Sequence, residues 1–308
     1  MKKLKHLVIA GGKGFLGTSI LEYWGKEFER VTILTRQALP QKGHVHYVEW
    51  DGKNPGPWVN VINHCDLLIN LTGKNVNCRY TEENKAEILR SRIDSTLALG
   101  AAVIMAEHPP KVWMNSSSAT IYEGSFDYAN TEEKGIIGED FSMNICKAWE
   151  QTFFDIPTPH SRKVALRTSL VFGKNGGVFP LLKKLALLGT GAGPQIMSWI
   201  HEEDFVRALR FIADNEEAEG PINITSPHPH PFHYLMETMP HFLPLITPPK
   251  WMLNIGARLL GTETELMLKS RWVLPERLIK AGFEFKYGRI QQAIADLTSA
   301  HNKHKIAY

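Results

Sequence analysis

The stretch that decides the fold is HLVIAGGKGFLGTSILEYW, residues 6–24. It begins with a short apolar run, His6–Ala10, passes through a glycine-rich turn and continues with helical periodicity. Gly11, Gly14 and Gly17 have G-x-x-G-x-x-G spacing. Glycines let a backbone turn tightly and approach a pyrophosphate, and the following helix directs its free N–H groups at the phosphates. The order of strand, glycine turn and helix therefore predicts a dinucleotide-binding Rossmann site.

The end of the next predicted strand indicates which dinucleotide is bound. This strand, Val31–Thr35, is followed directly by Arg36, with no acidic residue beside it. An NAD site usually has an Asp or Glu about 20 residues past the glycines, where it accepts from the ribose 2′-hydroxyl. The guanidinium of Arg36 can instead pair with a 2′-phosphate, so the sequence predicts NADP(H). The alternative is a solvated surface arginine.

Two further strand ends carry candidate cofactor contacts. Asp51 follows the predicted strand His46–Trp50, and it either bonds the adenine amino group or holds the turn in DGKNPGP. Leu71, Thr72 and Gly73 come at the end of the fourth strand. Small residues at that place allow the backbone to contact the ribose and the pyrophosphate.

A long helix is predicted over Glu82–Glu107, with Thr81 as a suitable residue before its first turn. Lys85 and Arg92 are seven residues apart and share one face of this helix. That face either directs a cation at the cofactor phosphates or forms a salt-bridged outer surface with neighbouring glutamates.

The whole first half of the chain alternates short apolar runs with helical patterns. The runs are nearly continuous, which is typical of parallel strands buried on both faces. The predicted strands are His6–Ala10, Val31–Thr35, His46–Trp50, Leu67–Leu71, Lys111–Ser116 and Lys163–Val171, and the predicted helices are Phe15–Phe28, Glu82–Glu107 and Phe141–Phe154. We therefore expect an α/β fold: a doubly wound parallel Rossmann sheet over residues 1–172. A smaller, mostly helical substrate lobe is expected over 173–308, with some segments returning to the first domain.

Composition narrows the function classes. The 308 residues are 43% apolar and 22% charged, and the net charge of +3 is spread along the chain. This gives no support for binding nucleic acid or a membrane surface, and no apolar run approaches the about 18 residues of a membrane helix. The odd set of Cys65, Cys78 and Cys146 argues against disulfides and a zinc site, so we expect no metal and a cytoplasmic location.

Several segments together resemble the extended short-chain dehydrogenase/reductase superfamily. They are AGGKGFLG (10–17), NLTG (70–73), SSSATIYEG (116–124), RTSLVFG (167–173) and SWIHEEDF (198–205). Other segments are similar to its "epimerase family" branch, which has a distinctive C-terminal segment: CRYTEENKAEILRSR (78–92), CKAWE (146–150), GVFPLL (177–182) and LPERLIKAGFEFKY (274–287). The resemblance covers nearly the whole chain. It implies an NADP(H)-binding Rossmann domain with a substrate lobe over the nicotinamide.

The resemblance also implies individual cofactor contacts, motif by motif. They are Gly11, Gly14, Phe15, Leu16 and Gly17 at the pyrophosphate, Thr35 and Arg36 at the 2′-phosphate, Leu71 and Thr72 at the ribose edge, and Glu87, Arg92 and Leu170 elsewhere. The pyrophosphate and 2′-phosphate assignments agree with what the residues themselves predict. Those of Glu87 and Leu170 rest on the resemblance alone.

The catalytic residues of the superfamily are only partly present. Its chemistry uses a Tyr as proton donor or acceptor, a Lys four residues later that lowers the tyrosine pKa, and a Ser that orients the substrate. Ser118 and Lys147 match the Ser and the Lys, but Met143 stands at the tyrosine position. No tyrosine occurs between Tyr128 and Tyr234, so the usual acid–base residue is absent.

Three replacements for the tyrosine are open. Tyr122 lies beyond a strand end, where it either reaches the substrate pocket or packs in the core. His201 either titrates near neutral pH or is a structural residue between a strand and the following helix. Glu139 and Asp140 are first of all charges at a helix N-terminus, stabilised there by the helix dipole.

Two hypotheses about function follow. The first is an NADP(H)-dependent oxidoreductase or epimerase that acts on a small carbonyl or hydroxyl compound, for example a nucleotide sugar, with Ser118, Tyr122 and Lys147 as catalytic candidates. The second is a binding protein that senses NADP(H) without turnover. The missing tyrosine favours the second, whereas the retained Ser118, Lys147 and substrate lobe favour the first.

Overall fold

The computed structural model describes residues 4–37, 39–187, 189–190, 193–246 and 269–299. These residues form a seven-stranded parallel sheet in the order β11-β6-β5-β4-β1-β2-β3. Its strands are β1 (His6–Ala10), β2 (Arg30–Thr35), β3 (Val45–Glu49), β4 (Leu67–Asn70), β5 (Val112–Ser118), β6 (Arg162–Thr168) and β11 (Gly220–Ile224). The doubly wound α/β fold predicted from the sequence is thereby confirmed.

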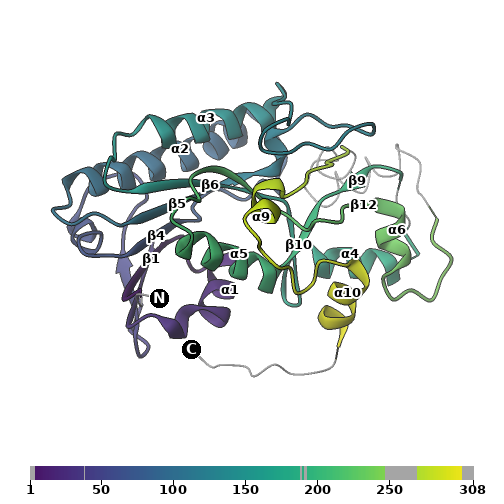
Figure 1. The fold of residues 1–308 in the computed structure, drawn as a ribbon, viewed down its shortest axis with the longest axis horizontal. Coiled ribbons are helices and arrows are strands. Elements are labelled where there is room, and N and C mark those ends of the chain that lie inside the picture. Colours follow the sequence, from purple (N-terminus) through teal and green to yellow (C-terminus); the bar gives the residue numbers. More distant parts are fainter. Residues whose placement is uncertain (1–3, 38, 188, 191–192, 247–268, 300–308) are drawn as a thin grey trace.

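Helices cover both faces of this sheet (Figure 1). On one face lie α2 (Glu82–Met105) and α3 (Phe141–Asp155), and on the other α1 (Phe15–Tyr23) and α5 (Glu202–Asp214). Successive side chains of a strand point to opposite faces, so in β1 the side chain of Leu7 joins the core under α1 and α5 while that of Val8 joins the core under α2 and α3. Burial on both faces explains why these strands are continuously apolar.

The helices begin where their capping residues lie. Thr81 accepts a hydrogen bond from the Asn84 amide over 3.2 Å at the start of α2, and Asp140 accepts from the Met143 amide over 3.0 Å at the start of α3. Each bond satisfies an amide that has no partner inside the helix. The predicted first helix is too long, because α1 ends at Tyr23 and a 3₁₀ turn, Gly25–Glu27, follows it.

The predicted strand Lys163–Val171 is in fact two strands that belong to different sheets. β6 ends at Thr168, and Ser169 donates its amide to the Ile224 carbonyl at the edge of the large sheet. The chain then continues as β7 (Leu170–Gly173), which pairs with β8 (Gly176–Gly177) and β10 (Trp199–His201) in a three-stranded sheet. This small sheet connects the Rossmann unit to the C-terminal lobe.

Strand β11 is absent from the sequence predictions because it begins with Gly220-Pro221. Proline cannot donate to a ladder and is tolerated mainly on edge strands. β11 lies at the edge of the sheet and pairs only with β6. A segment beyond residue 173 therefore returns to the large sheet.

The rest of the C-terminal part packs around a core of its own, which includes Phe172, Trp199, Leu235 and Ile294. Its remaining elements are α4 (Phe179–Leu187), β9 (Ile196–Met197), β12 (His230–Pro231), α6 (Phe232–Glu237), α9 (Glu276–Lys280) and α10 (Ile290–Thr298), and short 3₁₀ turns also occur at Pro57–Val61 and Ala119–Ile121. β9 and β12 pair with each other in antiparallel fashion. The lobe is mostly helical, as predicted, but it contains short strands as well.

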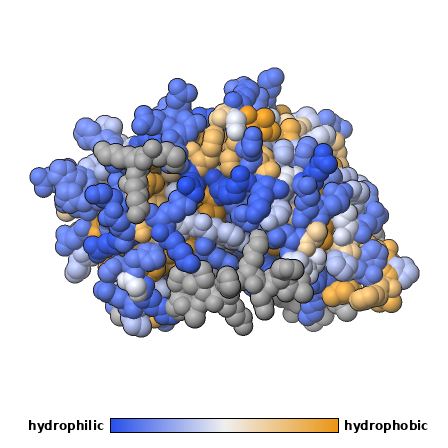
Figure 2. Space-filling model, turned by 60° about the horizontal axis from the view of Figure 1, so that its bottom comes forward, coloured by the Kyte–Doolittle hydropathy of each residue, from blue (hydrophilic) through white to orange (hydrophobic). Residues whose placement is uncertain are grey.

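The molecular surface and the three cysteines have ordinary properties. The face in Figure 2 is largely hydrophilic, with hydrophobic residues gathered in a few places. No helix in the described ranges is long and apolar enough to cross a membrane.

Cys65, Cys78 and Cys146 are free thiols. Burial raises the pKa of Cys146 to about 12, so this thiol stays protonated and packs as a small apolar residue.

One half-buried histidine should make the fold sensitive to acid. His6 lies in β1, its Nε2 is 2.9 Å from Thr32 Oγ1, and burial, with a contribution from Arg30, lowers its pKa to about 4. The unfolded chain therefore binds one more proton between about pH 6.5 and 4, and stability is lost as the pH falls through this window. When the pH falls from 7.5 to 5, the free energy of unfolding of the wild type should drop by about 1 kcal/mol more than that of His6→Gln, as measured by urea unfolding at both pH values. This figure allows for the partial exposure of the His6 side chain. Equal losses in the two proteins would contradict the assignment.

Candidate functional site

The glycine-rich turn between β1 and α1 needs its glycines for different reasons. Gly11 has φ 77°, a conformation that other residues rarely adopt, and a Cβ there would lie 3.1 Å from the Leu71 carbonyl carbon. A Cβ on Gly17 would lie 2.5 Å from the Gly12 carbonyl carbon, so the helix packs directly on the turn. Gly14 is the N-cap of α1 and supplies no side-chain cap. The first amides of α1 are thus left for an anion at the helix N-terminus.

Phe15 and Leu16 form the start of α1 and are both half-buried. The ring of Phe15 lies against the β7–β8 hairpin, where a Cβ on Gly173 would come within 2.5 Å of it. The side chain of Phe15 is therefore occupied in packing, and its backbone amide is the group at the turn.

The carboxyl end of β2 brings Thr35 and Arg36 to the same edge of the sheet. Thr35 is buried, whereas Arg36 is exposed and forms no hydrogen bond or ion pair with any residue in the described part of the chain. A second cation is close by, because Lys13 Nζ lies 3.5 Å from Gln37 Oε1. The end of β2 therefore offers positive charge without an acidic partner.

Asp51, just past the end of β3, holds a turn. Its carboxylate accepts from the amides of Lys53 and Asn54 over 2.8 and 2.9 Å, and these bonds lower its pKa to about 2. Of the two alternatives for this residue, the structure shows the turn.

The end of β4 lies directly beside the glycine turn. Asn70 accepts from the Thr72 amide over 3.0 Å, and the Thr72 amide nitrogen would lie 3.2 Å from a Cβ on Gly11. The Thr72 hydroxyl oxygen is buried and has no hydrogen-bond partner among the described residues. A buried polar atom without a protein partner is unusual, and a ribose or phosphate oxygen of a bound dinucleotide would supply one. The close-packed glycines and this hydroxyl fit the pyrophosphate and ribose of a dinucleotide.

Arg92 points from α2 toward this region and is half-buried. Its Nη1 donates to the carbonyls of Lys74 and Ile88 over 3.2 and 2.9 Å, and its guanidinium lies 5.1 Å from the centre of the Trp149 ring. Burial lowers its pKa, and it forms no ion pair with a carboxylate in the part of the chain that is described. A Cβ on Gly73 would lie 3.2 Å from Arg92 Cζ, so the guanidinium lies next to the segment 71–73 that is predicted to contact the cofactor.

Three other residues from the sequence analysis are engaged in other contacts. Glu87 is exposed and pairs with Lys74, which lowers the pKa of Glu87. Lys85 pairs with Glu82 over 2.9 Å, so it takes the salt-bridged alternative, in contrast to Arg92. Leu170 begins β7 and is half-buried against the core of the C-terminal lobe.

The positions of the usual catalytic residues lie on β5 and α3. Ser118 ends β5, and its hydroxyl accepts from the Thr120 amide over 3.1 Å and donates to Thr120 Oγ1 over 3.0 Å. Met143 is buried in the first turn of α3, where a Cβ on Gly138 would overlap its sulfur. Lys147 lies one helical turn later on the same face and is half-buried. Met143 thus fills the tyrosine position with a group that carries no proton.

Tyr122 does not face open space. Its side chain has no exposed surface, and its hydroxyl accepts from Arg167 Nη1 over 2.7 Å and donates to Asn223 Oδ1 over 2.9 Å. Burial raises the pKa of this hydroxyl. Because both of its hydrogen bonds are used inside the core, the geometry favours the packing alternative for Tyr122 over the catalytic one.

A buried ion pair explains why Tyr122 is held so firmly. Arg167 on β6 donates to both carboxylate oxygens of Glu150 on α3, over 2.9 and 2.7 Å. Ser117 donates to the same carboxylate over 2.5 Å. These contacts tie β5, β6, β11 and α3 together next to the candidate site, and sequence reasoning missed them.

His201 is also structural. It is fully buried, accepts from the Glu203 amide over 3.1 Å as the cap of α5, and lies 4.0 Å from Tyr287, centre to centre. Its Nε2 is 3.3 Å from Asp296 Oδ2. The structural alternative for His201 thus agrees with the geometry.

A cavity of about 550 Å³ opens beside Met143. Its wall combines the loop 123–140, the first turn of α3 and Lys269-Ser270 from the C-terminal segment. Ser270 donates to the Ser125 carbonyl over 2.6 Å, which joins the two segments. Met143, which stands at the tyrosine position, lines this cavity, so we treat it as the candidate substrate pocket.

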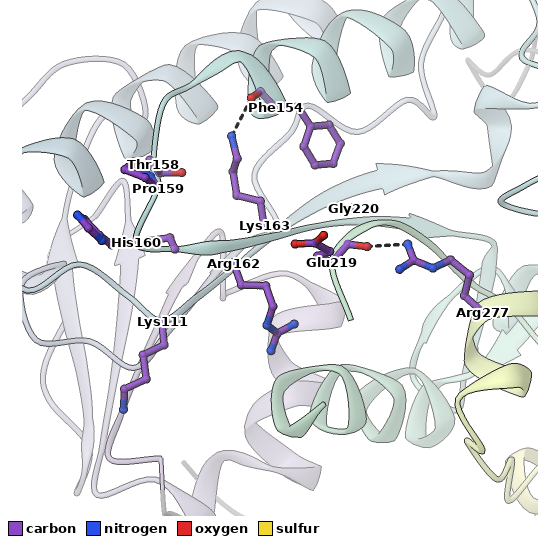
Figure 3. A pocket seen from close by; sticks show the side chains of 11 residues that line it. Lys111, Phe154, Thr158, Pro159, His160, Arg162, Lys163, Glu219, Gly220 and Arg277 are labelled. Carbon is purple, nitrogen blue, oxygen red and sulfur yellow. Dashed lines mark hydrogen bonds between the residues drawn. The ribbon is translucent and has the colours of Figure 1, made fainter. Parts of the chain in front are cut away.

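A second, larger hollow of about 810 Å³ lies at the opposite edge of the sheet, at the amino ends of β6 and β11 (Figure 3). Lys111 in its wall pairs with Asp66 over 2.9 Å, and three further cations are held by backbone carbonyls. Lys163 donates to three carbonyls at the end of α3, Arg162 to Ile212 and Ala213 at the end of α5, and Arg277 to Glu219 and Pro221. Cations at helix C-termini stabilise the fold. The hollow lies at the amino ends of the strands, whereas the glycine turn follows the carboxyl end of β1. We therefore assign it a structural role.

Comparison with known proteins places this geometry in a family. A family model described as "NAD dependent epimerase/dehydratase family" matches residues 7–225. This chain belongs to that family. Residues 248–297 match a domain of unknown function (DUF1731), of which residues 248–268 fall outside the described residues. The resemblance that the sequence motifs indicated is thereby confirmed.

Relatives in this epimerase family are similar over nearly their whole length. The epimerase family protein SSP1921 of Staphylococcus saprophyticus is 33% identical over 96% of this chain and 99% of its own length. YfhF of Bacillus subtilis is 31% identical over 95% and 97%. The crystal structure of human epimerase family protein SDR39U1 with NADPH has a TM-score of 0.80 at 24% identity, over 95% of this chain and 98% of that one. It has the same fold as this chain.

Proposed function

We propose that this protein is an NADP(H)-dependent oxidoreductase that acts on a small carbonyl or hydroxyl compound. The observation that carries the cofactor choice is Arg36, an exposed guanidinium at the end of β2 with no acidic residue beside it. The NADPH in the human relative supports the same choice. We also propose a cytoplasmic location on the basis of the odd set of three cysteines.

The residues of the site have separate tasks in this proposal. The first amides of α1 and the Thr72 hydroxyl bind the pyrophosphate and ribose, and Arg36 binds the 2′-phosphate. When bound, NADPH would supply a hydride to a carbonyl carbon, and the carbonyl oxygen would take up a proton from solvent. Ser118 orients that oxygen. The positive charge of Lys147 lies on the same face of α3 as position 143, where the family's tyrosine would stand.

Arg36→Ala should selectively weaken NADPH binding. The variant loses a charge-assisted pair with the 2′-phosphate, so we expect its NADPH dissociation constant to rise by about 10- to 100-fold while the NADH constant stays within about twofold. Isothermal titration calorimetry measures both. Arg30→Ala is the matched control, because Arg30 is exposed at the other end of the same strand. Equal affinity for the two cofactors, with no loss in Arg36→Ala, would contradict the NADP(H) assignment.

Met143 at the tyrosine position supports a second candidate, a sensor that binds NADP(H) without turnover. NADPH oxidation across a panel of carbonyl compounds and nucleotide sugars separates the two. We expect turnover by the wild type and a loss of about tenfold or more in Ser118→Ala, with NADPH affinity unchanged. Tight NADPH binding with no turnover of any compound would favour the sensor, and an active Ser118→Ala would remove Ser118 from the site.

A further inference from the structure

The cavity beside Met143 has a mainly apolar interior. Met143 is buried at its floor, and Phe126 and Ile137 stand in its wall with 57% and 37% of their surface exposed. Covering large apolar side chains with a ligand is favourable, because each Å² of apolar surface removed from water contributes about 25 cal/mol to binding. Their exposure beside the tyrosine position therefore points to a ligand with an apolar body.

The charges of this wall are mostly negative. Its carboxylates are Glu123, Glu139 and Asp140, and its ammonium group, Lys269, is already paired with Asp140. Glu123 and Glu139 are both exposed at the rim. Even when the nearby Arg271 is counted, carboxylates outnumber cations in the described part of the wall. An anionic group that entered here would meet like charges, which costs affinity.

The wall of the cavity is closely packed at two points, which hold its shape. A Cβ on Gly138 would overlap the Met143 sulfur, and a Cβ on Gly124 would lie 2.9 Å from the Ser270 carbonyl oxygen. Ser270 in turn accepts from the Ile196 amide and donates to Ser125, so the wall is joined to the C-terminal lobe. A preformed wall of this kind selects ligands by shape and charge.

We infer that the substrate is a carbonyl or hydroxyl compound with an apolar body and no anionic group, and that it binds against Phe126, Ile137 and Met143. The inference rests on the proposed oxidoreductase function and sharpens it. It removes the nucleotide sugars from the substrate class, because their diphosphate would face Glu123 and Glu139.

The test uses two probes that differ only in a carboxylate, acetophenone and 4-acetylbenzoate, with UDP-glucose as a third. Binding to the full chain saturated with NADP⁺ is measured by saturation-transfer NMR, so that no hydride transfer is needed for a signal. We expect acetophenone to bind at least about tenfold more tightly than either anion. Phe126→Ala should weaken acetophenone about fivefold or more, whereas Tyr128→Ala, on the same loop but outside the cavity wall, should not.

The outcomes separate this inference from the proposed function. If NADP⁺ itself fails to bind, the proposed function is wrong. If NADP⁺ binds but acetophenone does not, or if 4-acetylbenzoate or UDP-glucose binds more tightly, the inference about the substrate is overturned. A double variant Glu123→Gln/Glu139→Gln should narrow the difference between acetophenone and 4-acetylbenzoate, and an unchanged difference would also overturn it.

Discussion

Gly17→Ala should remove most NADPH binding and weaken the fold at the same time. A Cβ on Gly17 would lie 2.5 Å from the Gly12 carbonyl carbon and would overlap further atoms of that peptide. The Gly12 atoms in this contact are all backbone, so no side chain can move aside, and α1 must separate from the turn. We expect the NADPH dissociation constant to rise by at least about 100-fold and the free energy of unfolding to fall by about 1–3 kcal/mol.

The control for Gly17→Ala is Gly14→Ala in the same turn. Gly14 has φ −74°, which any residue adopts, and the nearest atom to a Cβ there is 3.6 Å away. We expect the free energy of unfolding of this variant to stay within about 0.5 kcal/mol of the wild type. Urea unfolding and isothermal titration calorimetry on both variants make the comparison. A Gly17→Ala protein that is as stable as Gly14→Ala and still binds NADPH would show that the close packing of α1 on the turn is not required.

The sequence predicts those parts of the fold that depend on local patterns. Continuous apolar runs indicate the buried parallel strands, and Thr81 correctly indicates the start of α2. The pattern fails where a strand lies at an edge or changes sheets. β11 begins with Gly220-Pro221, and the run that holds β6 and β7 gives no sign of the break at Ser169, because that break is made by pairing with Ile224, which is distant in sequence.

The same division applies to the candidate site. The glycine spacing and Arg36 are local features, and they describe the cofactor edge well enough to predict NADP(H). The environment of Tyr122 depends on Arg167 and Asn223, which lie 45 and 101 residues away. No local pattern indicates that these three side chains meet. The absence of the usual tyrosine is visible in the sequence, whereas the cavity that Met143 and Lys269 border appears only in the fold.

Arg167→Met should be strongly destabilising and should leave the cofactor turn untouched. Glu150 is 8% exposed and accepts two hydrogen bonds from Arg167 and one from Ser117. Without the guanidinium, its carboxylate is a buried charge with no cation from the described residues bonded to it. Breaking one side of a buried ion pair typically costs about 3–5 kcal/mol, and we expect a loss of this size in urea unfolding at neutral pH.

Tyr122→Phe is the matched variant on the same network. It removes one hydroxyl and leaves the pairing of Arg167 with Glu150 in place, so the expected loss is about 1–2 kcal/mol. NADPH affinity, and turnover of any substrate that is found, should stay at the wild-type level. If turnover collapses in Tyr122→Phe while stability is unchanged, Tyr122 is catalytic and its structural assignment is wrong.

The double variant Arg167→Met/Glu150→Leu distinguishes the loss of charge balance from the loss of packing. Replacing both members of a buried ion pair by apolar residues of similar size is often neutral or stabilising, so the double variant should regain most of what Arg167→Met loses. Ser117 and Tyr122 each lose one partner in it, and these two unmet hydrogen bonds should leave a remaining loss of about 1–3 kcal/mol. If the double variant is as unstable as Arg167→Met alone, the buried carboxylate is not the cause, and the role of Arg167 lies instead in its bond to Tyr122.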